Sequence, residues 1–248
     1  MRVLGRDRVD GVVFDMDGVV TDTASVHAGA WKRLFDEYLA ERARRRGEPF
    51  VAFDDDADYR RYVDGKPRYD GVRDFLASRG IVLPEGGASD APDEETVSGL
   101  GKRKDAYFLA RIREHGVRAY PSSVELVRRL KEAGFGVAVI SASRNLDEVL
   151  EAAGIGDLFP VEVGGRDAEA LRLAGKPDPA VFLEAARRLG VAPSRTVVIE
   201  DALAGVEAGR SGRFGLVIGV DRTGQAAELR ARGADVVVNN LAELMVAP

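Results

Sequence analysis

The stretch VVFDMDGVVTDT, residues 12–23, places a short apolar run directly before two aspartates, Asp15 and Asp17, and a glycine. The apolar run predicts a buried β-strand, and the glycine that follows the acids predicts a sharp turn at its end. Two carboxylates so close together raise each other's pKa and destabilise the fold unless something compensates them. A metal ion, a helix or chemistry on a substrate would each offset that repulsion.

Four later segments are also short, β-branched and apolar: GVAVI (136–140), TVVI (196–199), FGLVIGV (214–220) and ADVVV (234–238). The segments 122–134 and 178–190 have the apolar period and the end signals of helices. Apolar strands that alternate with helices indicate a parallel sheet covered on both faces. We therefore expect an α/β protein with a Rossmann-like, doubly wound parallel sheet.

Residues 24–116 differ, because they show helical periodicity and no convincing strand. Apolar residues at helical spacing indicate a packed helix core here: Trp31, Leu34, Phe35, Tyr38 and Leu39. ERARRRGE (41–48) predicts a solvated helix end, and the Gly/Pro/acid-rich segment 84–95 predicts a mobile loop. An insert after the first strand would lie above the carboxyl edge of the sheet, where ligands bind. We expect a catalytic core of residues 1–23 and 117–248 and a helical cap domain of residues 24–116.

The overall composition favours a soluble protein and leaves room for a local basic pocket that binds a phosphorylated small molecule. The 248 residues carry a net charge of -5, which argues against broad binding to nucleic acid or anionic membranes. The lack of cysteine excludes disulfides and thiolate catalysis and disfavours a zinc site. The sequence shows neither a signal peptide nor a bilayer-spanning segment. We expect a monomeric protein of the cytoplasm.

The acids at strand ends admit two interpretations when each pair is considered alone. Asp15 is a candidate nucleophile or metal ligand and Asp17 a candidate general acid/base, but a turn stabilised by aspartate side chains accounts for them equally well. A calcium loop fails because a strand precedes the acids. Glu200 and Asp201 follow another apolar strand, where Asp201 could be a helix N-cap. Acids at two strand ends together form a hard-oxygen cluster suited to Mg²⁺.

Two further segments could bind phosphate. The strand at 136–140 is followed by polar side chains, namely Ser141, Ser143, Arg144 and Asn145. Taken alone they are better explained as a helix cap, but hydroxyls, backbone donors and a guanidinium at a helix start also hold phosphate. Lys176 precedes Pro177 and a helix start. A lysine there is ordinarily solvated, whereas beside the acids it would neutralise a transferred phosphoryl group.

These motifs in this order carry a family resemblance over nearly the whole chain. DMDGVVTD, then Ser141, then Lys176 with its proline, then Glu200 and Asp201 resemble the haloacid dehalogenase superfamily of phosphotransferases. FDMDGVVTDTASVHAGAWK, SASRN, GKPDPAVF and EDALAGV are similar to segments of its β-phosphoglucomutase family. The resemblance implies that Asp15 is the nucleophile that becomes an aspartyl phosphate.

The same resemblance assigns the other core residues. It implies that Asp17 is the general acid/base, and that Ser141 and Lys176 hold the transferring phosphoryl group. It implies a Mg²⁺ site made of these residues: Asp15, the carbonyl of Asp17, Glu200 and Asp201.

The resemblance also implies substrate-binding residues. Arg68 would grip the phosphate that is not transferred, and Ser143, Arg144 and Asn145 would meet it from the core. The other implied positions lie in or at the entrance to the insert: Thr23, His27, Gly65 and Lys104. The familiar mutase has lysine where Arg144 stands and asparagine where Asp105 stands, and both departures bear on which sugar is bound.

The implied activity is that of a Mg²⁺-dependent phosphomutase that interconverts β-D-glucose 1-phosphate and glucose 6-phosphate through an aspartyl phosphate and a bisphosphate. The alternative is a phosphatase of the same superfamily that hydrolyses a sugar phosphate or another small phosphomonoester. A dehalogenase would have no evident use for Asp17 and the metal ligands, and a non-catalytic sensor would more naturally have lost Asp15 or Asp17. We therefore expect an enzyme.

Overall fold

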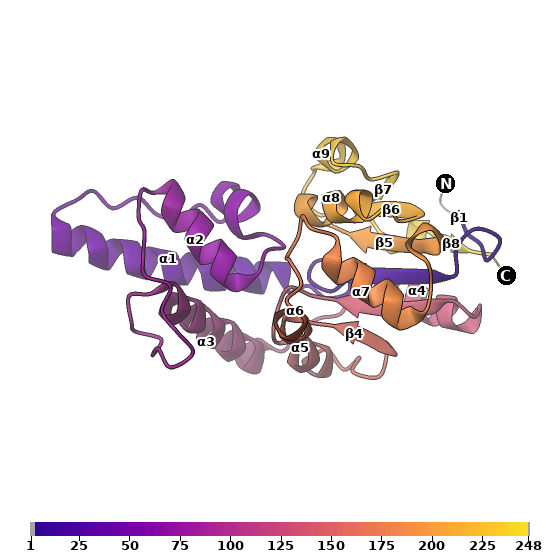
Figure 1. Ribbon diagram of the computed structural model, residues 1–248, viewed down its shortest axis with the longest axis horizontal. Coiled ribbons are helices and arrows are strands. Elements are labelled where there is room, and N and C mark those ends of the chain that lie inside the picture. The colour runs from indigo at the N-terminus through magenta and orange to yellow at the C-terminus, as the bar shows by residue number, and fades with distance from the viewer. Residues whose placement is uncertain (1–2, 248) are drawn as a thin grey trace. The chain divides into compact units, whose positions relative to one another are not determined.

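The computed structural model describes residues 3–247, which divide into two compact units. One unit, here the α/β unit, contains the described residues up to Asp22 and those from Val117 onward. The other, here the helical unit, is Thr23–Gly116. Figure 1 shows strands only in the first of these, and long helices make up the second.

The α/β unit is built on a six-stranded sheet in which every neighbouring pair is parallel. The strand order is β4-β3-β2-β5-β6-β7. The bounds are β2 Gly11–Asp15, β3 Gly136–Ile140, β4 Val161–Val163, β5 Thr196–Glu200, β6 Leu216–Val220 and β7 Val236–Val238. The predicted doubly wound parallel sheet is thus confirmed, and each apolar segment of the sequence analysis forms a strand.

Three strands were not predicted. β4 has only three residues, and Glu162 at its centre interrupts the apolar run. β1 (Val3–Leu4) and β8 (Met245–Val246) form a separate parallel pair from opposite ends of the chain. Segments of two or three residues carry no periodicity that a sequence pattern could detect.

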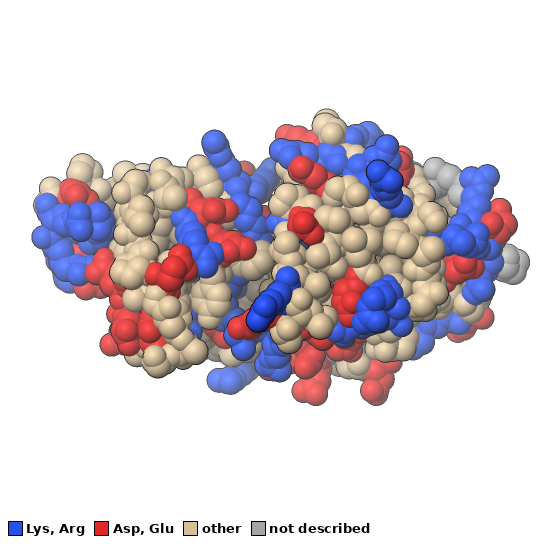
Figure 2. All heavy atoms as spheres, viewed as in Figure 1, with Lys and Arg blue, Asp and Glu red and all other residues tan. Residues whose placement is uncertain are grey.

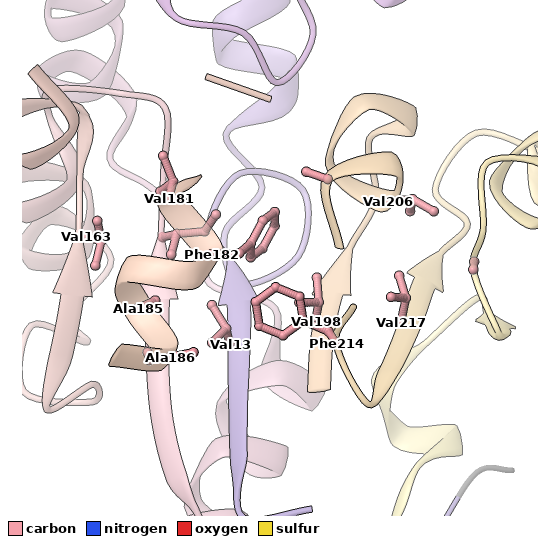
Figure 3. Packing of buried hydrophobic residues seen from close by; sticks show 14 of the residues in the cluster. Val13, Val163, Val181, Phe182, Ala185, Ala186, Val198, Val206, Phe214 and Val217 are labelled. Carbon is pink, nitrogen blue, oxygen red and sulfur yellow. The ribbon is translucent and has the colours of Figure 1, made fainter. Parts of the chain in front are cut away.

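Helices cover both faces of the six-stranded sheet. α7 (Ala180–Leu189) and α8 (Leu203–Ser211) pack with strand residues such as Val13 and Val198 in one buried cluster, shown in Figure 3. Side chains alternate along a strand, so Phe14 points to the opposite face, where its ring lies 5.8 Å from that of Phe159. The remaining α-helices among the described residues of this unit are α4 (Pro121–Glu132), α5 (Leu146–Ala152), α6 (Gly165–Leu171) and α9 (Ala226–Ala231).

The sheet topology marks where a ligand would bind. From β2 the chain continues to β3 and β4 on one side of the sheet, and it then returns to β5, β6 and β7 on the other. The order therefore reverses between β2 and β5, and open α/β sheets bind ligands at the carboxyl ends of strands at such a point. Asp15 is the last residue of β2 and Glu200 the last of β5.

The helical unit contains α1 (Ala24–Arg46), α2 (Arg68–Ser78), α3 (Val97–His115) and a short π-helical turn, Tyr59–Val63. Its described residues include no strand, as expected. The predicted apolar face is buried in one core cluster: Trp31, Leu34, Phe35, Tyr38 and Leu39. No helix within residues 3–247 combines the length and the apolar character that crossing a bilayer requires.

The predicted solvated end of α1 is also confirmed. Figure 2 shows basic side chains gathered at this end, and the last turn consists of the exposed residues Arg44, Arg45 and Arg46. Gly47 then ends the helix with a φ of 67°. Basic residues at a helix C-terminus interact favourably with its dipole.

Residues 84–95 form an irregular segment, as expected, but the segment is tied to α3. Lys102 Nζ donates to the carbonyl oxygens of Ala88 at 2.8 Å and Asp90 at 2.5 Å. Ser98 Oγ donates to the carbonyl oxygen of Gly87 at 2.7 Å. These bonds argue against the mobile loop that we expected, because its backbone is held at several points.

Candidate active site

Three carboxylates meet at the topological switch point. Asp15 ends β2, Glu200 ends β5, and Asp201 follows it, so the parallel sheet carries all three to one edge. One carboxylate oxygen from each lies within 4.8 Å of the others. Asp15 is 4% exposed and Glu200 is fully buried. Hard oxygen ligands at this spacing fit Mg²⁺, so these residues could hold the ion that the sequence analysis implies.

Lys176 lies between two of these acids. Its Nζ donates to Glu200 Oε2 at 2.7 Å and also to Asp15 Oδ1. Lys176 is buried, and the peptide bond that joins it to Pro177 is cis. The ring centroid of Phe182 lies 5.4 Å from Nζ, which places the ammonium against the apolar core. The solvated surface lysine considered from the sequence is therefore excluded.

The charges of this cluster do not balance. Burial, followed by the neighbouring charge of Glu200, raises the pKa of Asp15 well above its usual range, although Lys176 opposes the rise. Burial alone would lower the pKa of Lys176, but the charges of Asp15 and Glu200 outweigh it and hold that pKa above its usual range. Two buried carboxylates that share one ammonium keep an excess of negative charge, which a bound cation would offset.

Asp17 lies beside the end of the neighbouring strand. Ser141 Oγ donates to Asp17 Oδ2 at 2.8 Å, and the backbone N–H of Ser143 donates to Ser141 Oγ at 3.0 Å. The contact follows from strand pairing, because Ile140 of β3 is the partner of Asp15 in β2. The hydroxyl is therefore fixed from one side and holds the Asp17 carboxylate from the other.

The simpler explanations of these residues as helix caps do not describe what the structure contains. The N-cap of α8 is Ala202 rather than Asp201, and the Ala202 N–H donates to Glu200 Oε1 at 3.0 Å. The N-cap of α5 is Asn145, whose side chain makes no capping bond. The Asn145 N–H instead donates to Ser143 Oγ at 3.2 Å.

Two glycines allow the acids to approach so closely. Gly18 has a φ of +85°, and a Cβ there would lie 1.9 Å from Asp201 Oδ2. Gly205, near the start of α8, lies against Glu200, and a Cβ there would lie 2.1 Å from Glu200 Cδ. Any side chain at either position would displace a carboxylate. Gly18 is the glycine that the sequence predicts in the turn after β2, whereas Gly205 was not identified from the sequence.

Arg144 has a neighbour that the sequence did not suggest. Its side chain is 43% exposed, and Nη1 lies 3.0 Å from Glu169 Oε2. Asn145, the next residue, is 4% exposed. The four polar residues after β3 are therefore not equivalent, because Ser141 contacts Asp17 whereas Arg144 forms an ion pair at the surface.

The other expected substrate-binding residues lie in the helical unit. Lys104 Nζ is 2.5 Å from His27 Nδ1, and it also lies 5.1 Å from the ring centroid of Trp31 and 4.8 Å from that of Phe108. A cation against two aromatic faces is favourable, so Lys104 is held with its ammonium partly desolvated.

An ion pair in the helical unit involves Asp105, which stands where the familiar mutase has asparagine. Arg68, at the start of α2, has Nη1 2.8 Å from Asp105 Oδ2 on α3. Gly65 precedes this helix in a turn with a φ of 67°, and Thr23, directly before α1, is fully buried.

Two further residues of the site, both polar, were not identified from the sequence. Arg222 Nε donates to the carbonyl oxygen of Gly18 at 2.8 Å, and Gln225 Nε2 donates to that of Asp201 at 3.2 Å. Both follow β6, whose carboxyl end lies at the same edge of the sheet as those of β2 and β5. Their position directly after β6 is the feature of the sequence that could have identified them, since polar residues after any strand of a parallel sheet reach this edge.

Comparison with known proteins adds independent information. A family model described as haloacid dehalogenase-like hydrolase matches residues 9–213. The chain is 50% identical over 248 residues to β-phosphoglucomutase of Mycobacterium bovis, covering 98% of this chain and 95% of that one. A crystal structure of β-phosphoglucomutase from Clostridium difficile has a TM-score of 0.73 at 26% identity, over 95% of this chain and 93% of the other.

A hydrolytic relative is also similar. The phosphorylated carbohydrates phosphatase of Thermotoga maritima is 28% identical, over 86% of this chain and 85% of its own length. Sequence similarity over most of the chain therefore extends to a protein named as a phosphatase as well as to one named as a mutase.

Proposed function

The chain belongs to the haloacid dehalogenase-like hydrolase family and is an enzyme, and from this premise we propose that it is a magnesium-dependent phosphomutase. The proposed reaction interconverts β-D-glucose 1-phosphate and glucose 6-phosphate through an aspartyl phosphate and a bisphosphate. The observation that carries the proposal is the buried cluster in which Lys176 bridges Asp15 and Glu200. The 50% sequence identity of the chain to a β-phosphoglucomutase supports the choice of a mutase. We further propose a monomer in the cytoplasm.

Asp15 and Asp17 divide the chemistry between them. Asp15 attacks phosphorus, the bond from phosphorus to the ester oxygen breaks, and Asp17 gives its proton to the departing oxygen. In the return step a sugar hydroxyl attacks the aspartyl phosphate while Asp17 takes the proton of that hydroxyl. The bond from Ser141 to Asp17 supports this role, because it fixes the orientation of the carboxyl group that must donate and then accept.

The attack of a carboxylate on a phosphate dianion needs positive charge at the site. Asp15, Glu200 and Asp201, with the carbonyl of Asp17, would hold Mg²⁺, which when bound neutralises charge on the phosphoryl oxygens. Lys176 adds a fixed cation beside the nucleophile. The excess negative charge of the acid cluster supports this assignment.

The mutase needs a second phosphate site, because its intermediate carries two phosphates. We assign that site to Arg68 together with Ser143, Arg144 and Asn145. The remaining substrate-binding residues in the proposal are Thr23, His27, Gly65 and Lys104. Arg68 already forms a charged pair with Asp105, so it is able to bind an anionic oxygen.

The second candidate is a phosphatase on a sugar phosphate or another small phosphomonoester. It is favoured by the similarity to the Thermotoga maritima phosphatase. The two candidates share Asp15, Asp17 and the metal ligands, and they differ in whether a sugar hydroxyl or water accepts the phosphoryl group. Contacts to the second phosphate therefore decide between them.

One assay separates the candidates. The protein is incubated with β-D-glucose 1-phosphate, Mg²⁺ and a catalytic amount of a glucose bisphosphate, and the products are identified. Glucose 6-phosphate as the main product supports the mutase, whereas free glucose and inorganic phosphate support the phosphatase. The Asp15→Asn variant is the control, because loss of the nucleophile should abolish either activity. A panel of other sugar phosphates then identifies the preferred substrate.

A further inference from the structure

The loop between β6 and α9, residues 221–225, is built as a rigid element. Asp221 Oδ1 accepts bonds from three successive backbone N–H groups, those of Thr223 at 3.2 Å, Gly224 at 2.7 Å and Gln225 at 2.9 Å. The Asp221 N–H donates to the carbonyl oxygen of Val238 at 2.8 Å, at the end of β7. A loop held in this way directs its side chains with little freedom.

Arg222 extends from this loop to the segment that follows Asp17. Its Nε donates to the Gly18 carbonyl at 2.8 Å, and its guanidinium carbon lies 3.9 Å from the ring centroid of Tyr120. The Tyr120 hydroxyl in turn donates to Asp22 Oδ1 at 3.1 Å. Among the residues that the structure describes, Arg222 Nη2 is buried and has no hydrogen-bond partner. A buried donor without a partner costs stability, so folding alone does not explain an arginine here.

The bond from Arg222 completes the fixation of Gly18. The Gly18 N–H donates to the carbonyl oxygen of Thr21 at 2.8 Å, and its carbonyl oxygen accepts from Arg222. A trans peptide is planar, so the direction of the Gly18 N–H also sets the direction of the Asp17 carbonyl, which points the opposite way. The carbonyl assigned to the metal is therefore oriented through a glycine that is held on both sides.

Gln225 acts on the other acid segment. It is 7% exposed, and its Nε2 donates to the carbonyl oxygen of Asp201 at 3.2 Å. The Asp201 carboxylate also packs directly against Gly18, because a Cβ at position 18 would lie 1.9 Å from Asp201 Oδ2. One loop thus holds the backbone beside Asp17 and the backbone of Asp201, although these come from different strand ends.

We propose that Arg222 and Gln225 are positioning residues, which set the geometry of the Asp17 carbonyl and of Asp201 for binding a divalent cation. The inference rests on the proposed function for the Asp17 carbonyl as a metal ligand and for the reaction that the cation serves. Neither side chain touches the substrate in this scheme. Replacement of residues that hydrogen-bond to metal ligands and orient them typically changes metal affinity or activity by about 10- to 100-fold.

The test measures Mg²⁺ binding to the metal-free full-length protein by isothermal titration calorimetry, without substrate. Arg222→Met keeps an unbranched stem against Tyr120 and removes every donor. We expect its Kd for Mg²⁺ to rise by about 10- to 100-fold, and that of Gln225→Met to rise by a smaller factor. Arg230→Ala is the matched control, because this exposed arginine on α9 makes a single side-chain hydrogen bond among the described residues, to the Ala226 carbonyl at 3.4 Å. Its Kd should match that of the wild type.

A structural role is separated from a positioning role by thermal unfolding in EDTA. A lower midpoint with an unchanged Kd for Mg²⁺ would overturn the proposal, and so would unchanged values of both. Arg222→Lys provides a second variant that keeps the cation, and its Kd should lie between those of wild type and Arg222→Met. If the Kd values shift as expected but the wild type has no mutase activity, the positioning role stands and the proposed function fails.

Discussion

Lys176 Nζ lies 2.7 Å from Glu200 Oε2 and also donates to Asp15, so a single ammonium serves two buried carboxylates. All three groups are almost removed from water. Removal of charged groups from water costs free energy, and the attraction between opposite charges offsets that cost only while each charge keeps its partner. The cluster is therefore an electrostatic weakness of the fold as well as the proposed site of the chemistry.

Removal of the ammonium should destabilise the metal-free protein strongly. Lys176→Met leaves Asp15 and Glu200 uncompensated, and breaking a buried pair in this way costs about 3 to 5 kcal/mol. Urea unfolding in EDTA measures the loss. Mg²⁺ should restore part of it, because the cation replaces the missing charge. A variant as stable in EDTA as the wild type would contradict the compensating role of Lys176.

Asp15→Asn should stabilise the metal-free protein while it abolishes activity. Burial and then Glu200 raise the pKa of Asp15 well above its usual range, so ionisation of its carboxyl costs more in the folded protein than in the unfolded chain. An amide of the same shape avoids that cost and leaves Lys176 paired with Glu200. We expect a gain of about 1 to 4 kcal/mol in the free energy of unfolding in EDTA at pH 7.

The pH dependence of the Asp15→Asn effect follows from the direction of the shift. Above the usual pKa of 3.8, the unfolded chain releases the Asp15 proton while the folded protein retains it up to the raised value. The wild-type stability therefore falls as the pH rises through this window, and the variant lacks the loss. The difference between the two should shrink as the pH is lowered toward 4. A constant difference from pH 4 to pH 8 would contradict the assignment. Asp15→Asn should also rescue Lys176→Met in a double-mutant cycle.

The sheet could be predicted because its strands are continuous and apolar. The runs at 136–140 and 196–199 are buried on both faces, and such strands are visible in the sequence without alternation. Glu162 in β4 and the distant pairing of β1 with β8 could not be inferred, since neither gives a local pattern.

The candidate site was predictable only in part, for a geometric reason. Residues directly after an apolar strand were found because parallel strands end at one edge. Contacts across that edge depend on strand order, which the sequence does not contain. The bridge from Lys176 to two acids, the bond from Arg222 to Gly18 and the pairing of Arg144 with Glu169 all belong to this second kind.

Gly18→Ala should disrupt metal binding through Asp201. The new Cβ would lie 1.9 Å from Asp201 Oδ2, in a backbone conformation at φ +85° that side chains rarely adopt. Backbone strain of this kind costs on the order of 1 to 3 kcal/mol. We expect that loss of stability together with at least a ~10-fold weaker Mg²⁺ affinity, measured by calorimetry.

Gly190→Ala is the matched control for Gly18→Ala, because Gly190 directly follows α7 and lies outside the loop of residues 221–225. Its φ is +69°, and no heavy atom lies within 4 Å of the new Cβ. The two variants therefore share the backbone strain, and only Gly18→Ala displaces a carboxylate. Equal Mg²⁺ affinities in the two variants would refute the close-approach explanation.

Glu184 on α7 should make a measurable contribution to acid lability. Hydrogen bonds from Arg187 and then Arg188 lower the pKa of Glu184 to about 2. Its stabilising effect is present above the usual value of 4.5 and is lost as the pH falls toward 2. Between pH 6 and pH 3, the wild type should lose about 1 to 2 kcal/mol more than Glu184→Gln in urea unfolding, a value reduced by partial solvation of the arginines. Parallel losses would show that the ion pairs are too solvated to matter.

Arg68 and Asp105 provide the sharpest test of the second phosphate site. If Arg68 binds the phosphate that is not transferred, Arg68→Ala should raise the KM for the bisphosphate by about 10- to 100-fold, the value of a charged hydrogen bond. Hydrolysis of a small monophosphate should change far less. Asp105→Asn removes the carboxylate that lies 2.8 Å from Arg68, so Arg68 no longer has to break an ion pair before it binds the phosphate. The KM for the bisphosphate should then fall by about two- to five-fold.

The control for the Arg68 variants is Arg73→Ala on the same helix. Arg73 pairs with Glu85 at 2.9 Å on the surface of the helical unit, so its removal changes the net charge equally without touching the proposed site. Its kinetic constants should match the wild type. If Arg68→Ala impairs the mutase reaction and simple hydrolysis to the same extent, Arg68 does not bind the second phosphate. The phosphatase would then be the better description, because a monophosphate substrate offers no second phosphate to bind.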